Sequence, residues 1–212
     1  PYDFATALTP VSLLARSPLL LVVRADSPAR TLAELLERLR ARPGQIAWGS
    51  SGTGTVTHLA PVLLLSLAKV QGNHVSYRGG AASIAGLLGG DVEFVFSTLP
   101  QSAPLVKEGR LRGLAVSTIQ RLAALPEVPT VAEQGFPGFD LFDWLGFYVP
   151  TGTPAPVIAR WQQAAAAGMR DETAVQRLGE IGMIPVGGST AEFRAFWADQ
   201  REKMGALIRA EG

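Results

Sequence analysis

The sequence predicts an α/β fold built on a mostly parallel sheet. Strands and helices alternate through the first half of the chain, and glycine-rich turns follow several of the strands. Hydrophobic residues make up 47% of the 212 residues, which is enough to bury a core. Strictly alternating strands and helices favour a parallel sheet with helices on both faces. The length fits one large domain or two small lobes.

Short apolar runs mark the strands of the first half, and turn or capping residues separate them from helices. The expected strands are residues 19–23, 46–48, 74–77, 91–96 and 113–117, and the expected helices between them are residues 31–40, 55–69, 81–88 and 102–108. Thr31 and Glu34 form a capping box at the first helix, which ends before Pro43-Gly44. Gly89-Gly90 ends the third helix.

The second half has a different balance of elements. The expected elements are a strand over residues 139–149, and helices over 153–169, from 171 and over 189–209. Thr153 is expected as an N-cap with Pro154 at the first helical position, and Thr130 and Glu133 form a second capping box, closed by Gly135. One strand offers too little sheet to bury three helices. This half therefore needs strands from elsewhere.

The composition excludes several classes of function. A net charge of +1 argues against binding to nucleic acid, because no basic stripe is available to follow a phosphate backbone. The absence of cysteine excludes disulfides, thiolate metal sites and a cysteine nucleophile. The longest apolar run, residues 18–23, is far shorter than the ~20 residues of a membrane span. The chain is expected not to be embedded in a membrane, and no export signal is visible in it.

The most informative segment is the loop Gly49–Gly54, which joins an apolar strand to an apolar helix. Small residues at such a junction expose backbone N–H groups and hydroxyls at a helix N-terminus, which favours binding of an anion. The alternative is a tight structural turn. The candidate ligand-binding residues here are Ser50, Ser51, Gly52, Gly54 and Thr55.

The loop does not match the known phosphate or nucleophile motifs. A nucleotide-binding P-loop would need a lysine after Gly54, where Thr55 stands. The glycines at 49, 52 and 54 do not fit the dinucleotide pattern, and Thr53 replaces the last glycine of a hydrolase elbow. The loop is therefore expected to bind an anion without catalysing a reaction on it.

Four further residues are candidates because they lie at the same edge of the predicted sheet, where the carboxyl ends of parallel strands meet. They are His58, Tyr77, Gly79 and Ser97. His58 is equally consistent with a structural, hydrogen-bonded role, and Ser97 with a plain turn. Arg78 is interpreted as a surface charge and His74 as structural. The sequence shows no metal-ligand cluster and no nucleophile–base pair, so no metal, cofactor or catalytic residue is expected, and the chain is not expected to be an enzyme.

The residues also resemble a known family. The segments that carry the resemblance are 10–14, 49–59, 75–79, 87–92, 109–116, 125–133 and 149–154, including Gly-Ser-Ser-Gly-Thr-Gly-Thr-Val-Thr-His-Leu, Tyr77-Arg-Gly and Leu-Leu-Gly-Gly-Asp-Val. Together they resemble the receptors of tripartite tricarboxylate transporters, the Bug-type extracytoplasmic solute-binding proteins. The match differs at Ser97, where the family often has Asp or Asn, and around Ala81–Gly86.

The resemblance implies a type II periplasmic-binding-protein fold whose two lobes close on a small organic acid. It implies a pocket of N–H groups and hydroxyls formed by the nine candidate residues, a membrane transporter as partner, a periplasmic location and a monomer. The expected division is a hinge segment over 1–18, a ligand-binding lobe over 19–117, and a hinge return with part of the other lobe over 118–212. The N-terminal part of the lobe to which residues 118–212 contribute is expected to be missing from this chain.

Two other functions remain open from the residues alone. The first is a cytoplasmic small-molecule sensor domain of similar fold. The second is an enzyme acting on an anionic metabolite at the glycine-rich loop, which the absence of a general base disfavours. The solute itself is left open among dicarboxylates, amino acids and aromatic acids.

Overall fold

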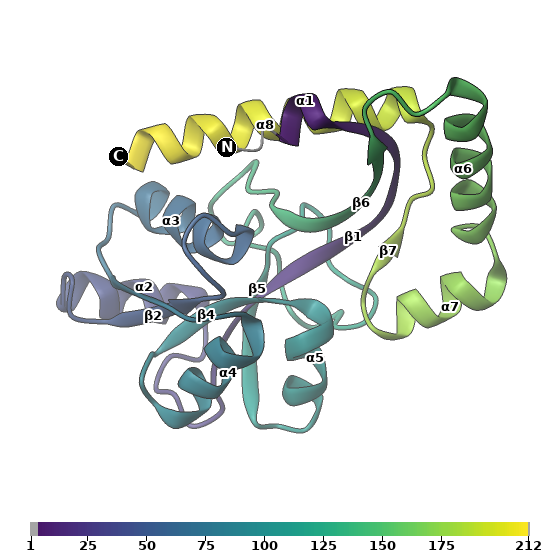
Figure 1. The fold of residues 1–212 in the computed structure, drawn as a ribbon. Coiled ribbons are helices and arrows are strands. Elements are labelled where there is room, and N and C mark those ends of the chain that lie inside the picture. The colour runs from purple at the N-terminus through teal and green to yellow at the C-terminus, as the bar shows by residue number, and fades with distance from the viewer. Residues whose placement is uncertain (1–3, 212) are drawn as a thin grey trace. The chain divides into compact units, whose positions relative to one another are not determined.

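The computed structural model describes residues 4–211, which form two compact units (Figure 1). Unit 1 contains the described residues up to Ser17 together with Trp144–Ala206. Unit 2 contains Pro18–Asp143 and the described residues from Leu207. The elements are, in order, α1 (Phe4–Ala7), β1 (Leu8–Arg24), α2 (Leu32–Ala41), β2 (Ala47–Ser50), α3 (Val56–Ala68), β3 (Asn73–Ser76), α4 (Gly80–Gly89), β4 (Phe94–Thr98), α5 (Leu99–Lys107), β5 (Leu111–Val116), β6 (Phe142–Pro150), α6 (Ala155–Gly168), α7 (Glu172–Glu180), β7 (Ile184–Pro185) and α8 (Thr190–Glu211).

Unit 2 is built on the strands β3-β2-β4-β1-β5, in that spatial order. β2 pairs in parallel with β3 and β4, as the sequence predicted. β1 is antiparallel to both β4 and β5, so the expectation of a mostly parallel sheet is wrong for this strand. β1 enters the sheet as a continuation of a strand of unit 1, with no crossover helix before it, and a strand without a crossover is not constrained to run parallel.

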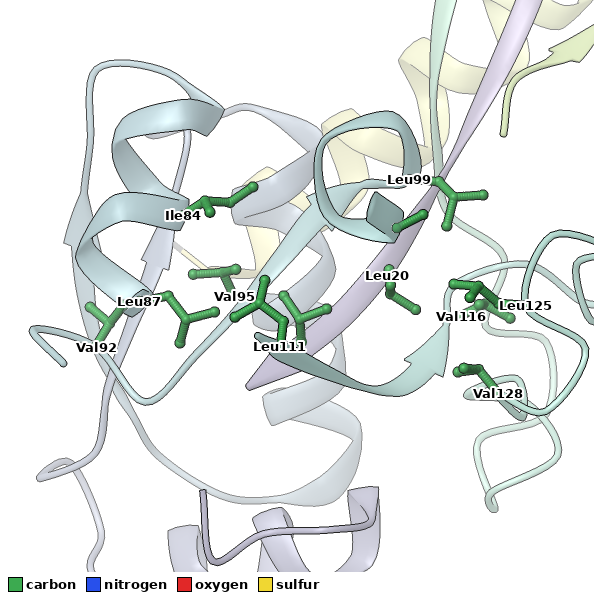
Figure 2. Packing of buried hydrophobic residues seen from close by; sticks show 12 residues of the cluster. Leu20, Ile84, Leu87, Val92, Val95, Leu99, Leu111, Val116, Leu125 and Val128 are labelled. Carbon is green, nitrogen blue, oxygen red and sulfur yellow. The ribbon is translucent and has the colours of Figure 1, made fainter. Parts of the chain in front are cut away.

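Helices cover both faces of the unit 2 sheet, with α4 and α5 on one face and α2 and α3 on the other (Figure 1). Figure 2 shows the core under α4, where Ile84 and Leu87 of the helix lie beside Val95 of β4, and Leu20 of β1 belongs to the same buried cluster. Leu20 and Val95 are completely buried. Residues of one face alternate with residues of the other along these strands, as expected for strands buried on both sides.

Local sequence signals account for most helix boundaries. Thr31 accepts a hydrogen bond from the Glu34 backbone N–H at 3.2 Å, and Asp171 caps α7 through the Ala174 N–H at 2.9 Å. Thr130 and Glu133 form both bonds of a capping box, but the residues that follow form only a turn. No helix follows this capping box, because Gly135 ends the segment before a second turn can form.

Other boundaries differ by a few residues from the expectation. β4 begins at Phe94 rather than residue 91, and α6 begins after Pro154, which is itself the N-cap in place of Thr153. The first half of β1 and the two-residue strand β7 were not predicted. β7 pairs with β1 at Ala15 and Arg16, within unit 1.

Candidate small-anion site

A cavity of about 310 Å³ lies at the carboxyl ends of β2 and β4, within unit 2. The lining residues come from the loops and helix starts after β2, β3 and β4, and include the end of β4 and the start of β6. They are Ser51, Thr55, Val56, Thr57, Gly80, Ser83, Phe96, Ser97, Thr98, Gln101 and Asp143. The structure thus brings together residues that follow β2, β3 and β4, at the edge of the sheet where the candidate residues were predicted to lie.

The loop after β2 is held by hydrogen bonds among its own hydroxyls. Thr57 Oγ1 accepts from the Ser51 backbone N–H at 3.0 Å and lies 2.6 Å from Ser51 Oγ. Thr55 Oγ1 donates to the Gly52 carbonyl at 2.7 Å. Gly52 and Gly54 have φ values of +141° and +81°, which residues other than glycine rarely adopt. These hydrogen bonds and glycine conformations fix the shape of the loop.

Three helices begin at this cavity, and none of them is capped by the side chain of its own N-cap residue. The N-cap residues are Thr55 for α3, Gly79 for α4 and Thr98 for α5. By contrast, Thr31 and Asp171 cap α2 and α7 away from the cavity. The first N–H groups of a helix lack intrahelical acceptors and carry a partial positive charge. Helix starts of this kind can receive an anionic group.

The candidate residues predicted from the sequence take three positions. Ser51, Thr55 and Ser97 line the cavity. Ser50 is the last residue of β2, and Gly52, Gly54 and Gly79 lie in the surrounding loops; none of the four lines the cavity. Gly79 directly precedes Gly80, a lining residue, and the buried Ser50 Oγ accepts from the Gly52 N–H at 3.2 Å.

His58 and Tyr77 do not line the cavity either. His58 Nδ1 accepts a hydrogen bond from the Gly54 N–H at 3.3 Å, so His58 contacts the loop from the first turn of α3. The Tyr77 ring packs against the core next to Gly86 of α4. Arg78 is exposed and is also absent from the lining.

Several lining residues were not singled out from the sequence. Gly80 follows β3, and Thr98 and Gln101 lie at or after the end of β4, at the edge where the site was predicted, but Thr57 and Ser83 were not considered. Ser83 is 4% exposed, and its hydroxyl has no hydrogen-bond partner among the described residues. Asp143 is the single ionisable side chain in the lining that the structure describes, and neither Lys nor Arg is present there.

Two histidines and a tryptophan stack beside the loop. The ring centroids of Trp48 and His74 are 4.3 Å apart, as are those of His58 and His74. His74 Nε2 lies 2.8 Å from Ser50 Oγ. Burial and, to a smaller extent, the neighbouring His58 lower the pKa of His74 below its ordinary value. The stack therefore favours a neutral His74.

We expect the stability of the protein to fall between pH 7.5 and pH 5.5 because of His74. The folded-state pKa is below the unfolded-state pKa, so the unfolded chain binds more protons as the pH decreases. The stabilising contribution is complete above the unfolded-state pKa of about 6.5 and is lost as the pH falls through the folded-state pKa. Urea unfolding at pH 7.5 and at pH 5.5 measures this difference in the free energy of unfolding. His74→Gln should reduce this pH dependence, and an identical slope in the variant would contradict the assignment.

The described residues hold no group of three or more His, Cys, Asp or Glu side chains that could bind a metal ion. Within the same residues, no helix is long and apolar enough to cross a membrane.

An α/β unit that gathers uncapped helix starts and hydroxyls around a small cavity at strand carboxyl ends is typical of proteins that bind a small anionic molecule. Comparison with known proteins defines the family. The profile of the tripartite tricarboxylate transporter family receptor matches residues 1–212, and the chain belongs to this family. The family is one of receptors, in agreement with the expectation that the chain is not an enzyme.

Two of the curated relatives that match nearly the whole chain are themselves longer than it. A protein of Pseudomonas sp. strain P51 from the tcbD–tcbE intergenic region is 34% identical over 209 residues, covering 98% of this chain and 62% of the relative. The protein BugT of Bordetella pertussis is 28% identical over 212 residues, covering all of this chain and 65% of the relative. The chain thus spans a little under two thirds of the length of these relatives.

Solved structures show the same fold. Rpa4515 of R. palustris, determined with adipate, has a TM-score of 0.88 and 34% identity, with 96% of this chain and 71% of that chain covered. MatC of Rhodopseudomonas palustris, with bound malate, has a TM-score of 0.86 and 25% identity, with 95% and 69% covered. These similarities confirm an α/β fold of the periplasmic-binding-protein type.

Proposed function

We propose that the chain is part of a periplasmic receptor that captures a small carboxylated solute for a membrane transporter of the tripartite tricarboxylate type. The observation that carries the proposal is the meeting of three helix starts, none with a side-chain cap, at one cavity of unit 2. Membership of a family of transporter receptors supports the proposed partner and location.

A carboxylate is the proposed anion, although Asp143, the single ionisable side chain of the described lining, is itself acidic. The described lining offers N–H groups and hydroxyls without Lys or Arg, so the ligand would be held by charge-assisted hydrogen bonds rather than by an ion pair. The volume of about 310 Å³ is suited to a small molecule. The relatives determined with adipate and malate support a carboxylated solute. Dicarboxylates, amino acids and aromatic acids are the classes to be tested.

The nine predicted residues are proposed to act in two ways. Ser51, Thr55 and Ser97 would contact the solute from the lining. The others would shape the surrounding turns: they are Ser50, Gly52, Gly54, His58, Tyr77 and Gly79. His58 would do so through its hydrogen bond to Gly54, and Tyr77 through its packing against α4.

Thermal unfolding in the presence of adipate, malate, glutamate and benzoate tests the proposal. A solute that binds only the folded state raises the midpoint by mass action. We expect a rise with at least one acid, and Thr55→Val should weaken the binding of that acid by about tenfold, since the loss of one hydroxyl costs about 1–1.5 kcal/mol. Isothermal titration calorimetry gives the affinity.

Thr118→Val is the matched control, because Thr118 Oγ1 bonds only to the nearby Gln120 carbonyl and lies outside the cavity lining. Its affinity should equal that of the unmodified chain. No midpoint shift with any of the four acids would count against a carboxylate site in this chain. An unchanged affinity in Thr55→Val would remove Thr55 from the site.

A further inference from the structure

Helix α4 presents its first turn to the cavity of unit 2. Gly80 and Ser83 both line the cavity, and residues three apart lie on the same face of a helix. The Ser83 N–H donates to the Gly79 carbonyl at 3.2 Å, which closes the first turn. The N–H groups that precede Ser83 lack intrahelical acceptors and carry a partial positive charge. This face of α4 is therefore suited to an anionic group.

The Ser83 hydroxyl is a second, independent sign that a ligand binds at this turn. The residue is 4% exposed, and its Oγ has no hydrogen-bond partner among the described residues. Ser102 of the next helix, α5, is also buried, but its hydroxyl donates to the Thr98 carbonyl at 3.1 Å. A buried hydroxyl without a partner has lost its bonds to water and gained none in return, and such groups are rare in folded proteins. A ligand oxygen in the cavity would supply the partner.

The protein around the Ser83 hydroxyl is apolar. A Cβ built on Gly49 of β2 would lie 3.0 Å from Ser83 Oγ, and 3.1 Å from both Tyr77 Cε2 and Val95 Cγ1. A ring edge and a methyl group thus share this small space with the hydroxyl, and neither forms a strong hydrogen bond. The cavity is another neighbour, because Ser83 belongs to its lining. Serine has three staggered χ1 positions, so its hydroxyl can turn toward the cavity without movement of the backbone.

Gln101 of α5 lies beside the same helix start. A Cβ built on Gly80 would lie 2.9 Å from Gln101 Nε2 and still nearer to its Oε1, so the side-chain amide rests on the Gly80 backbone. Glycine at this position leaves room for the amide, and both residues line the cavity. A glutamine amide can donate hydrogen bonds through its nitrogen. Two helices therefore bring several donors to one place, which matches the two oxygens of a carboxylate.

We propose that Ser83 is a solute-binding residue whose hydroxyl donates to an oxygen of a carboxylate seated at the first turn of α4. The proposal rests on the function proposed above and names the group of the solute that this residue contacts. Dicarboxylates, amino acids and aromatic acids all carry such a group. A hydrogen bond to a charged oxygen is stronger than one between two neutral groups, so the contact contributes to affinity for each of these classes.

Ser83→Ala separates this role from a structural one. The ligand-free variant should unfold at the same or a higher temperature than the unmodified chain, since it loses a hydroxyl without a partner and alanine is the stronger helix former. Adipate, malate, glutamate and benzoate are titrated into both proteins by calorimetry. Every acid that the unmodified chain binds should bind the variant about tenfold more weakly. A lower unfolding midpoint of the ligand-free variant would assign the hydroxyl to the structure and overturn the proposal.

Ser102→Ala is the matched control, because Ser102 is a buried helical serine of unit 2 that does not line the cavity. Its affinity for the same acids should equal that of the unmodified chain. Hydrogen exchange gives the place of binding. A saturating acid should slow exchange of the Ala82 amide at the first turn of α4, while the Glu34 amide, which Thr31 caps in α2, should exchange at an unchanged rate.

The failure of this proposal can be told from failure of the proposed function. If none of the four acids binds the unmodified chain, both fall together. If an acid binds but Ser83→Ala has the same affinity for it, or if exchange at Ala82 is not slowed, the receptor function stands and the assignment of Ser83 alone is overturned.

Discussion

Replacing Gly86 by alanine should destabilise unit 2, although a glycine-to-alanine change inside a helix ordinarily stabilises it by about 1 kcal/mol. A Cβ at Gly86 would lie 2.2 Å from Tyr77 Oη and 2.4 Å from its Cζ. The Tyr77 ring is partly buried and packs against the apolar core, so making room for the methyl group would disturb that packing. Overpacking of this kind costs about 1–3 kcal/mol. We expect a lower free energy of unfolding in urea, with loss of packing between α4 and the Tyr77 ring.

Gly179→Ala is the control for helix propensity, because Gly179 lies in α7 with no atom within 4 Å of the added Cβ. This variant should be neutral or more stable. Tyr77→Leu in the Gly86→Ala background should recover part of the lost stability, since it removes the ring that the new methyl group meets. If Gly86→Ala is as stable as the unmodified chain, or if the double variant is the less stable of the two, the close packing of Tyr77 on α4 is wrong.

Replacing Thr57 by valine should have the second large effect. The side chains have nearly the same shape, but valine cannot accept the hydrogen bond from the Ser51 N–H or contact Ser51 Oγ and Thr55 Oγ1. Thr57 is 6% exposed, so little water is available to replace it. A buried donor left without a partner costs about 1–3 kcal/mol. We expect a loss of stability in this range and weaker solute binding, because the loop loses its central acceptor.

The matched control is again Thr118→Val, whose single hydroxyl bond is at the surface and should cost well under 1 kcal/mol. Hydrogen exchange of the Ser51 amide offers a local measurement, since exchange at this N–H should accelerate in Thr57→Val but not in Thr118→Val. Equal stability of the two variants, or an unchanged exchange rate at Ser51, would show that the hydroxyl network does not hold the loop.

Local chemistry explains why much of the fold could be predicted. Thr31 and Asp171 cap their helices as expected, because the side chain and the backbone N–H that it satisfies are only three residues apart. The loop Gly49–Gly54 was recognised because glycines with positive φ and a following helix are local properties of the chain. The short supply of strands after residue 144 was also visible, since it follows from counting elements.

The sequence did not reveal the direction of β1, the packing of Tyr77 or the part that Thr57 plays in the site. β1 runs antiparallel because of how it enters the sheet, and no periodicity along the strand records that. Tyr77 was expected to face the ligand, but its ring packs beside Gly86, nine residues further along the chain. Thr57 accepts the Ser51 N–H only because the loop folds back on α3.

The sequence by itself thus determined the order of most elements, the cap at Thr31 and the loop that begins the site, all of which depend on neighbours within a few residues. Only the tertiary structure decided which residues after β2, β3 and β4 line the cavity, and which candidate side chains lie outside the lining. That choice depends on the distances between Ser51, Gly80 and Ser97, which lie on separate strand–helix connections. Their meeting is set by the packing of whole helices against the sheet, and no short stretch of sequence encodes it.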